Sequence, residues 1–366
     1  MAKNREYENN SSEGGSSKYK NILVIRFTAL GDVAISIPML YSFCYSNPDT
    51  EFTMLTQRFA STLFVNPPAN LKVIGIDTSN QYKGIKGMYR LYKDLSATNK
   101  FDAVADLHDV LRSHILSLLF SLLSGAKVRR INKGRRGKRR LTRGWSKRMF
   151  QLRSSHERYR EVFHRFGLRY VEIFETVFGG EKAEAKEFEQ ITAPKSSDER
   201  WIAIAPFAKH QGKIYPLDKM KEVVDGIATM SGVKIFLFGA GDYERGVLSE
   251  WVDVCENVIS MAEKKSSIAV ELALLSHIDV MVSMDSANMH LSSLVGLPVV
   301  SVWGATHPYC GFMGWRQSER NAVQLSLPCR PCSVFGNKPC RNGDYACLNN
   351  ITPEMIISKI EDLLNR

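Results

Sequence analysis

The stretch from Met281 to Pro308, MVSMDSANMHLSSLVGLPVVSVWGATHP, decides the fold of this chain. It reads as the end of a strand, a polar turn, a short helix and a second strand from Pro298 to Trp303. Backbone N–H groups at a helix start are unpaired and carry partial positive charge, so a phosphate docks there without a metal. A second polar loop, Gly304 to His307, ends the second strand, and two loops at neighbouring strand ends of an open α/β sheet form a ligand crevice. We therefore expect the C-terminal half to bind a phosphorylated small molecule.

The same alternation of strand and helix runs through the rest of the chain. In the N-terminal half, the apolar runs predict strands at Asn21–Arg26, Glu51–Thr56, Leu71–Ile76 and Phe101–Asp106. The helices expected there are Val33–Ser46, Arg58–Val65, Met88–Thr98, Leu111–Ser124, Glu157–Phe166 and Val171–Phe178. In the C-terminal half, we expect strands at Trp201–Ala205, Val233–Phe238, Val258–Ser260 and Val280–Ser283, and helices at Leu217–Met230, Tyr243–Cys255 and Ser267–Ser276. This rhythm predicts an α/β protein with doubly wound, Rossmann-like parallel sheets.

The length of 366 residues favours two domains, because a single core rarely grows that large. Residues 1–18 are polar and contain no hydrophobic stretch, which predicts a disordered tail and no signal peptide. We expect a first domain over residues 19–180, a charged linker over 181–199, and a second domain over 200–366. No apolar run reaches the roughly 18 residues of a membrane span, so a cytoplasmic protein is expected.

The formal net charge of +11 is concentrated in one segment, 127–148, which contains twelve Lys or Arg residues and no acidic residue. Such a run contacts nucleic acid, contacts an anionic membrane surface or phosphorylated acceptor, or is simply a solvated loop. Nucleic acid is the least favoured partner, because the run lacks interleaved aromatic residues and no nucleic-acid-binding module surrounds it.

Asp32 is the main candidate for proton transfer. It follows Gly31 where the first strand passes into a helix, and Gly31 allows a ligand to approach the backbone closely. An Asp there is either a helix N-cap or a carboxylate that takes a proton from a hydroxyl in the cleft. The segment contains no GxGxxG pattern, so a dinucleotide fingerprint is absent.

Two further loops follow strands in the C-terminal half. Lys209 and Lys213 lie in a Gly-containing loop where both can meet phosphate, although a solvated lysine is the alternative for each. Gly239 ends another strand, and Glu244 after it can accept ribose hydroxyls. Each loop alone is a weak signal, but together they favour a nucleotide-sugar site.

The cysteines gather near the C-terminus, with five of the seven between Cys310 and Cys347. The pattern Cys329-x2-Cys332-x7-Cys340-x6-Cys347 resembles a four-thiolate zinc site, but its spacing is irregular. The alternatives are reduced, packed cysteines, which we expect, and a redox function.

The combined motifs resemble family 9 glycosyltransferases, the lipopolysaccharide heptosyltransferases. The motifs are Arg26…Gly31-Asp32…Pro38, Asp106-Leu-His108-x3-Arg112-Ser113, Lys213-Ile-Tyr215-Pro216, and Asp285-Ser286-x3-His290…Gly296-x-Pro298…Gly304-x-Thr306-x-Pro308. The resemblance spans the chain from Asn21 onward. It implies a GT-B fold, with two facing Rossmann-like domains, and inverting, metal-independent transfer from a nucleotide sugar, typically ADP-heptose, to a lipid A–core acceptor. No cofactor is expected.

The resemblance also implies roles for individual residues. Asp32 matches the general base, and Lys213 matches the lysine that stabilises the departing diphosphate. The implied donor-binding residues are Lys209, Gly239, Glu244, Asp285, Ser286, Ala287, Asn288, His290 and Thr306. The implied acceptor-binding residues are Thr28, Gly31, His108, Arg112, Arg135, Arg136, Arg139 and Arg140.

Two features depart from the family pattern. Ala287 stands where the family often has Gly, and the basic segment is unusually dense. The acceptor is expected to be an anionic, lipid-linked glycan at the inner face of the cytoplasmic membrane, where the protein binds peripherally. A non-catalytic binder of nucleotide sugars or nucleic acid is the alternative function.

Overall fold

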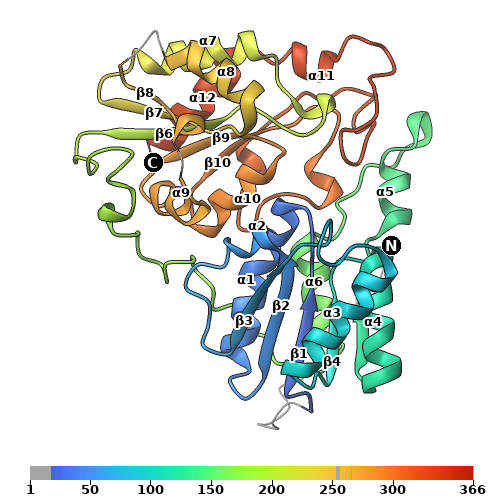
Figure 1. Ribbon diagram of the computed structural model, residues 1–366. Coiled ribbons are helices and arrows are strands. Elements are labelled where there is room, and N and C mark those ends of the chain that lie inside the picture. The colour runs from blue at the N-terminus through green and yellow to red at the C-terminus, as the bar shows by residue number, and fades with distance from the viewer. Residues whose placement is uncertain (1–17, 253–255, 265, 366) are drawn as a thin grey trace.

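The computed structural model describes residues 18–252, 256–264 and 266–365 (Figure 1). The predicted tail therefore falls almost entirely outside the described residues. Within them, the N-terminal half forms a five-stranded parallel sheet in the order β3-β2-β1-β4-β5. Its strands are β1 (Asn21–Ile25), β2 (Glu51–Gln57), β3 (Leu71–Ile76), β4 (Ala103–Asp106) and β5 (Lys127–Arg130).

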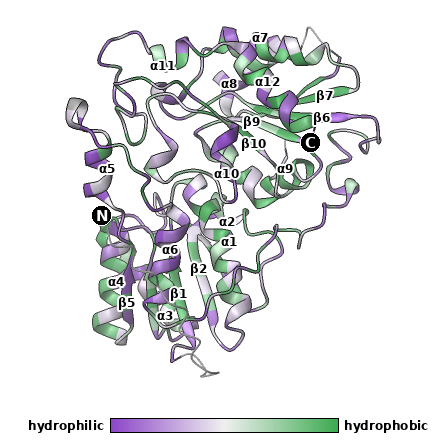
Figure 2. Cartoon of the chain, turned by 180° about the vertical axis from the view of Figure 1, so that it is seen from behind, coloured by the Kyte–Doolittle hydropathy of each residue, from purple (hydrophilic) through white to green (hydrophobic). Residues whose placement is uncertain are grey.

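Helices cover both faces of this sheet because the strand residues alternate between two apolar clusters. Ile22 and Val24 of β1 face α1 (Leu30–Ser46) and α6 (Ser155–His164), whereas Leu23 and Ile25 face α3 (Gly84–Thr98) and α4 (Leu111–Ser124). The shorter helices are α2 (Arg58–Ser61), α5 (Arg135–Leu141) and η1 (Gly144–Ser146). Figure 2 shows α4 as a largely hydrophobic helix beneath the hydrophilic α5.

The C-terminal half forms a six-stranded parallel sheet in the order β11-β10-β9-β6-β7-β8, within the described residues. The strands are β6 (Arg200–Ala205), β7 (Val233–Leu237), β8 (Val258–Ser260), β9 (Val280–Met284), β10 (Val299–Val302) and β11 (Ala322–Val323). The helices are α7 (Leu217–Ala228), α8 (Gly241–Val252), α9 (Ile268–Leu275), α10 (Ala287–Leu294), α11 (Ala346–Asn349) and α12 (Pro353–Leu364). The single turns are η2 (Ala185–Phe188), η3 (Gln211–Lys213), η4 (Met261–Glu263), η5 (Pro308–Cys310) and η6 (Glu319–Asn321). Two doubly wound parallel sheets confirm the predicted fold class.

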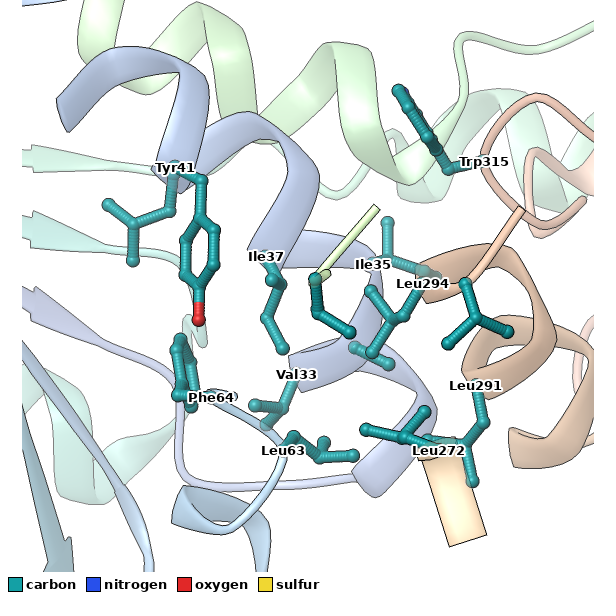
Figure 3. Close-up of a cluster of buried hydrophobic side chains, with 14 of the residues drawn as sticks. Val33, Ile35, Ile37, Tyr41, Leu63, Phe64, Leu272, Leu291, Leu294 and Trp315 are labelled. Atoms are coloured by element: carbon teal, nitrogen blue, oxygen red, sulfur yellow. The ribbon is translucent and has the colours of Figure 1, made fainter. Parts of the chain in front are cut away.

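The two halves share one hydrophobic core. Helix α1 of the first half packs against α10 of the second, and their buried side chains belong to one continuous cluster. Figure 3 shows Ile35 of α1 beside Leu294 of α10, and Val33 and Leu291 belong to the same cluster. The segment that follows α6 joins this contact, since the Phe174 N–H donates to Ser42 Oγ at 3.1 Å. The two halves are thus joined by a packed apolar contact.

Two sequence predictions are wrong. The helix expected at Val171–Phe178 is an irregular segment without helical hydrogen bonding. Its apolar residues Phe174 and Val177 are buried by α1 and α10 instead, and the Val177 N–H donates to Leu294 O at 2.8 Å. Asp32 is also not the N-cap residue, because α1 begins earlier and Ala29 occupies that position. Its side chain instead caps the helix from the N3 position, where it accepts a hydrogen bond from the Ala29 N–H at 3.5 Å.

Candidate active site

Asp32 projects from the first turn of α1, at the carboxyl end of β1. Its Oδ2 forms an ion pair with Arg26 Nη2, and its side chain keeps about a third of its surface exposed. Arg26 is buried, its Nη1 donates to Leu107 O at 2.8 Å, and its guanidinium lies over the Tyr159 ring at 5.8 Å. A buried arginine with these contacts fixes the orientation of the carboxylate. The structure therefore presents Asp32 as an oriented, solvent-accessible carboxylate.

His108 lies beside this carboxylate, directly after β4. The Phe27 N–H donates to His108 Nδ1, and the Nε2 atom lies 3.4 Å from Thr28 Oγ1. Because Nδ1 accepts a hydrogen bond, the neutral ring carries its proton on Nε2, and this N–H donates a hydrogen bond to Thr28 Oγ1. Burial and the Arg26 guanidinium lower the pKa of His108 to about 4, so the ring is neutral at pH 7. The structure thus brings Thr28 and His108 together beside Asp32.

The second half of the site is a buried ion pair between Lys213 and Asp285. The Lys213 ammonium lies 2.8 Å from Asp285 Oδ2 and donates to the Asp285 carbonyl at 3.0 Å. Thr306 Oγ1 donates to the same carboxylate oxygen at 2.8 Å. Asp285 is buried, so these donors hold its charge and fix the lysine nitrogen beside the start of α10.

Glycines allow the lysine loop to pack this closely. A Cβ on Gly336, whose φ is +73°, would lie 2.6 Å from Lys213 Cγ. A Cβ on Gly212 would lie 2.8 Å from Gly336 O. The Ala305 N–H also donates to Gly212 O at 2.8 Å, which ties this loop to the one after β10. Two loops from distant parts of the sequence are therefore locked together around Lys213.

Helix α10 begins beside Lys213, with Ser286 at its N-cap. The Ser286 side chain makes no capping hydrogen bond, and its Oγ instead lies 3.2 Å from Ser283 Oγ. The N–H groups of Ala287 and Asn288, in the first turn, have no partner within the helix because of their position. An ammonium group and the N–H groups of a helix start are both chemically suited to bind an anion.

His290 connects the two halves of the site. It is almost fully buried, its Nδ1 has no hydrogen-bond partner, and a Cβ on Gly31 would lie only 2.7 Å from its Cδ2. Burial lowers the pKa of His290 to about 4, although the carboxylates of Asp285 and Asp32 oppose that shift. The neutral ring therefore packs directly against the start of α1. This contact sets the spacing between Asp32 and the start of α10.

The remaining predicted donor-binding residues are Glu244, Gly239 and Lys209. The Glu244 carboxylate accepts a hydrogen bond from the Ala240 N–H at 2.7 Å, at the start of α8. Gly239 is close-packed, since a Cβ there would lie 2.9 Å from Leu248 Cδ1. Lys209 is exposed. Glu244 and Gly239 thus stabilise the loop after β7, whereas Lys209 lies on the surface.

The predicted acceptor arginines do not converge on Asp32. Arg112 Nη1 donates to Thr78 Oγ1 at 2.8 Å, beyond the end of β3. Arg135 pairs with Asp109 at 2.7 Å. The other three, Arg136, Arg139 and Arg140, are exposed on α5. Only Thr28, Gly31 and His108 of the predicted acceptor residues lie beside the carboxylate.

Sequence analysis missed Arg330, which organises the loop after β10. This buried guanidinium donates to the carbonyls of Gly304, Leu325 and Thr306, the last at 2.9 Å. It also donates to Gln324 Oε1 at 3.1 Å. The only signal in the sequence is an arginine between two cysteines, Cys329 and Cys332, and its neighbours there do not indicate burial.

The cysteine-rich segment shows no metal-binding arrangement in the parts of the chain that the structure describes. No group of three or more His, Cys, Asp or Glu side chains there is positioned to hold an ion. Cys347 is buried, and burial raises the pKa of its thiol to about 11. Cys329 is exposed, whereas Cys332 and Cys340 are half-buried. Cys329, Cys332 and Cys340 each also raise the pKa of Cys347, so the four thiols lie near one another.

Comparison with known proteins matches this architecture to one family. The sequence model of glycosyltransferase family 9 (heptosyltransferase) matches residues 88–345. Lipopolysaccharide heptosyltransferase 3 of Escherichia coli strain K12 is 24% identical over 349 residues, which cover 91% of this chain and 95% of that protein. Lipooligosaccharide heptosyltransferase 2 of Campylobacter jejuni is 26% identical over 133 residues, so the match spans only 40% of that relative and 36% of this chain.

A solved structure supports the same fold. The ADP-heptose lipopolysaccharide heptosyltransferase II of E. coli superimposes with a TM-score of 0.67 at 15% sequence identity, covering 94% of this chain and 98% of that one. This likeness confirms the GT-B arrangement of two facing doubly wound sheets. Because the family model matches more than half of the chain, the protein belongs to glycosyltransferase family 9, the heptosyltransferase family.

Proposed function

We propose that the protein transfers heptose from ADP-heptose to a hydroxyl group of a lipopolysaccharide-type acceptor, with inversion at the anomeric carbon and without a metal ion. The family assignment supports the reaction class. The names of the E. coli relatives support heptose as the sugar and ADP-heptose as its donor. The geometry of the site supports the roles of the individual residues.

The donor diphosphate binds at the start of α10. The N–H groups of Ala287 and Asn288 donate to its oxygens, and Lys213 lies beside them. Ser286 and His290 line the same turn, and Thr306 holds the Asp285 carboxylate that positions the lysine. These groups stabilise the negative charge that grows on the diphosphate as it leaves, which is the role that a metal has in other transferases.

Asp32 acts as the general base. Its carboxylate takes the proton of the acceptor hydroxyl, the hydroxyl oxygen forms a bond to the anomeric carbon, and the bond from that carbon to the diphosphate oxygen breaks. The bonding electrons leave with ADP. Attack from the face opposite the diphosphate inverts the configuration. Arg26 orients the carboxylate, and Thr28 and His108 lie where they can contact the acceptor.

The observation that carries this proposal is the contact between Gly31 and His290. The start of α1, which carries Asp32, packs against the start of α10. The proposed base and the proposed leaving-group site thus come from different halves of the chain and lie against each other, which supports an in-line displacement.

The test is the substitution Asp32→Asn. Its matched control is Asp49→Asn, which changes an exposed residue in the loop that follows α1. Transfer from ADP-heptose to a lipid A–core acceptor should fall by about 10²- to 10⁴-fold in D32N, because general-base catalysis contributes that much. ADP binding, measured by calorimetry, should stay within about twofold of the wild type, since Asp32 does not touch the diphosphate site. A D32N protein that retains the control's turnover number would overturn the role of Asp32. Thermal stabilisation by GDP or UDP but not by ADP would overturn the proposed donor.

A further inference from the structure

Helices α3 and α4 expose an apolar surface that the active site does not use. In α4, Leu111, Leu118 and Leu122 are exposed by 75%, 56% and 73%, and in α3 Ile85 is exposed by 71%. The α4 residues recur at intervals of seven and four, so they form one line along the helix. On the opposite side of α4, Leu116 and Phe120 are apolar because they pack in the core. Core packing does not account for the exposed leucines.

The two helices make this surface continuous. The Tyr92 hydroxyl of α3 lies 2.9 Å from Ser124 Oγ at the end of α4, and the Tyr89 ring stacks beside Tyr92 at 6.3 Å. Tyr89 and Leu123 are themselves about half exposed. An exposed apolar area that extends over two helices marks an interaction surface rather than scattered surface residues.

Positive charge lies against one end of this apolar surface. From residue 110 to residue 156 the sequence contains no acidic residue. Helix α5 is fixed beside the start of α4, because Arg135 pairs with Asp109 at 2.7 Å and Lys133 Nζ donates to Asp109 O at 3.2 Å. Figure 1 and Figure 2, seen from opposite sides, both show α5 above α4 along the same flank of the molecule.

The inner side of α5 faces the C-terminal half of the chain. The Lys138 ammonium lies 4.2 Å from the centre of the Phe312 ring, and burial, together with Arg158, lowers the pKa of Lys138 to about 8. Leu141 is buried against Cys310. With that side occupied, the exposed arginines and the exposed pair after them point away from the protein: Arg136, Arg139, Arg140, Arg143, Arg148, Met149 and Phe150.

We propose that this combined surface docks on an anionic lipid bilayer. We call it the α4–α5 face and define it by the exposed residues of α3 and α4 (Ile85, Tyr89, Leu111, Leu118, Leu122 and Leu123) and the exposed residues of 136–150 named above. The apolar residues enter the interface between headgroups and acyl chains, and the arginines bind lipid phosphates. The inference rests on the proposed function in one respect: a lipid-linked acceptor is held at such a surface.

The charge of the α4–α5 face favours a bilayer over a second copy of the chain. In a symmetric dimer the same patch meets itself, so the arginines of two copies would oppose each other without acidic partners. An anionic membrane supplies both the negative charge and an apolar layer. The occupant is therefore an anionic phospholipid surface.

The test is co-sedimentation of the full-length protein with vesicles of phosphatidylcholine alone or with about 30% phosphatidylglycerol. The wild type should bind the anionic vesicles at least tenfold more tightly, and salt should weaken this binding. Leu118→Gln combined with Leu122→Gln should weaken it by at least tenfold. Arg143→Gln combined with Arg148→Gln should weaken it by about fivefold per arginine, or about 25-fold together.

Matched controls remove equal numbers of apolar or charged side chains elsewhere. Val171→Gln with Ile173→Gln changes exposed residues beside α1, and Lys182→Gln with Lys186→Gln changes exposed lysines near η2. Both control proteins should bind vesicles like the wild type. Equal binding to neutral and anionic vesicles, wild-type binding by the L118Q/L122Q protein, or a dimer in solution that this variant dissociates would each overturn the proposal.

A second measurement separates this proposal from the proposed function. The L118Q/L122Q protein should transfer heptose to a deacylated, water-soluble acceptor at the wild-type rate, while its rate on vesicle-bound acceptor falls. If no form of the protein transfers heptose, but vesicle binding follows the pattern above, the function fails and the docking surface stands.

Discussion

Substituting Gly31 by Ala should separate the two halves of the active site without unfolding the protein. Gly31 lies in the first turn of α1 at a negative φ, so alanine suits its backbone conformation. The obstacle is spatial. The new Cβ would lie 2.7 Å from His290 Cδ2 and 3.4 Å from Ala287 Cα.

The contact sets the size of the effect. Ordinary carbon–carbon contact begins near 3.4 Å, so α1 and α10 must separate by about 0.7 Å. The His290 ring is only 7% exposed, so a shift of the ring must displace its neighbours. Overpacking of this kind costs about 1–3 kcal/mol, and the helix propensity of alanine returns up to about 1 kcal/mol. We expect a loss of about 0–2 kcal/mol in the free energy of unfolding, and a fall in kcat of about 10²-fold, because a displacement near 1 Å has that effect on a reacting pair.

The assay compares urea unfolding and heptose transfer for Gly31→Ala and Gly246→Ala. Gly246 lies in α8, and a Cβ there meets nothing within 4 Å. G246A should gain about 0.5–1 kcal/mol of stability and keep its activity. If G31A gains stability like G246A and transfers heptose normally, then the contact with His290 does not set the geometry of the site.

Two further predictions concern stability. Arg330→Met should destabilise the protein by about 3–5 kcal/mol in urea unfolding, because it leaves buried carbonyls such as Gly304 O and Thr306 O without a hydrogen-bond donor. A loss of stability below about 1 kcal/mol would show that water replaces the guanidinium. The free energy of unfolding should also decrease as the pH falls from about 6.5 to about 4. His290 and His108 each have a pKa of about 4 in the folded protein and about 6.5 in the unfolded chain. The unfolded chain therefore binds more protons than the folded protein in this pH window. Each histidine contributes up to about 3 kcal/mol to this decrease, so His290→Asn should flatten the curve, and parallel curves for the two proteins would contradict the assignment.

Much of the fold followed from local patterns in the sequence. The strand at Leu71–Ile76 and the helix at Leu111–Ser124 have the predicted bounds, since both are apolar runs with clear ends. The helix predicted at Val171–Phe178 failed because Phe174 and Val177 are three residues apart, which mimics helical spacing. Their burial is decided by α1 and α10, which lie far away in the sequence.

The basic segment was harder to interpret because its charge hides its structure. Lys127–Arg130 forms an edge strand beside β4, although three of its four residues are charged. Hydrogen bonds to β4 and the pairing of Arg130 with the buried Asp106 at 2.8 Å stabilise it. Neither contact can be read from the segment itself.

The site was predictable in its parts but not in its assembly. Loops after strands pointed to Asp32, Lys213 and the start of α10, because parallel strands direct their carboxyl ends to one edge. The pairing of Lys213 with Asp285 and the contact of Gly31 with His290 depend on how the halves dock. Local sequence carries no record of that docking.

The core shared by α1 and α10 has a consequence for engineering. A chimera that joins the N-terminal half of one family member to the C-terminal half of another must match two apolar surfaces as well as two binding sites. Val33 and Ile35 would meet foreign partners in place of Leu291 and Leu294 (Figure 3). Exchanging halves therefore disturbs this shared core, whereas single substitutions in the loops leave it intact.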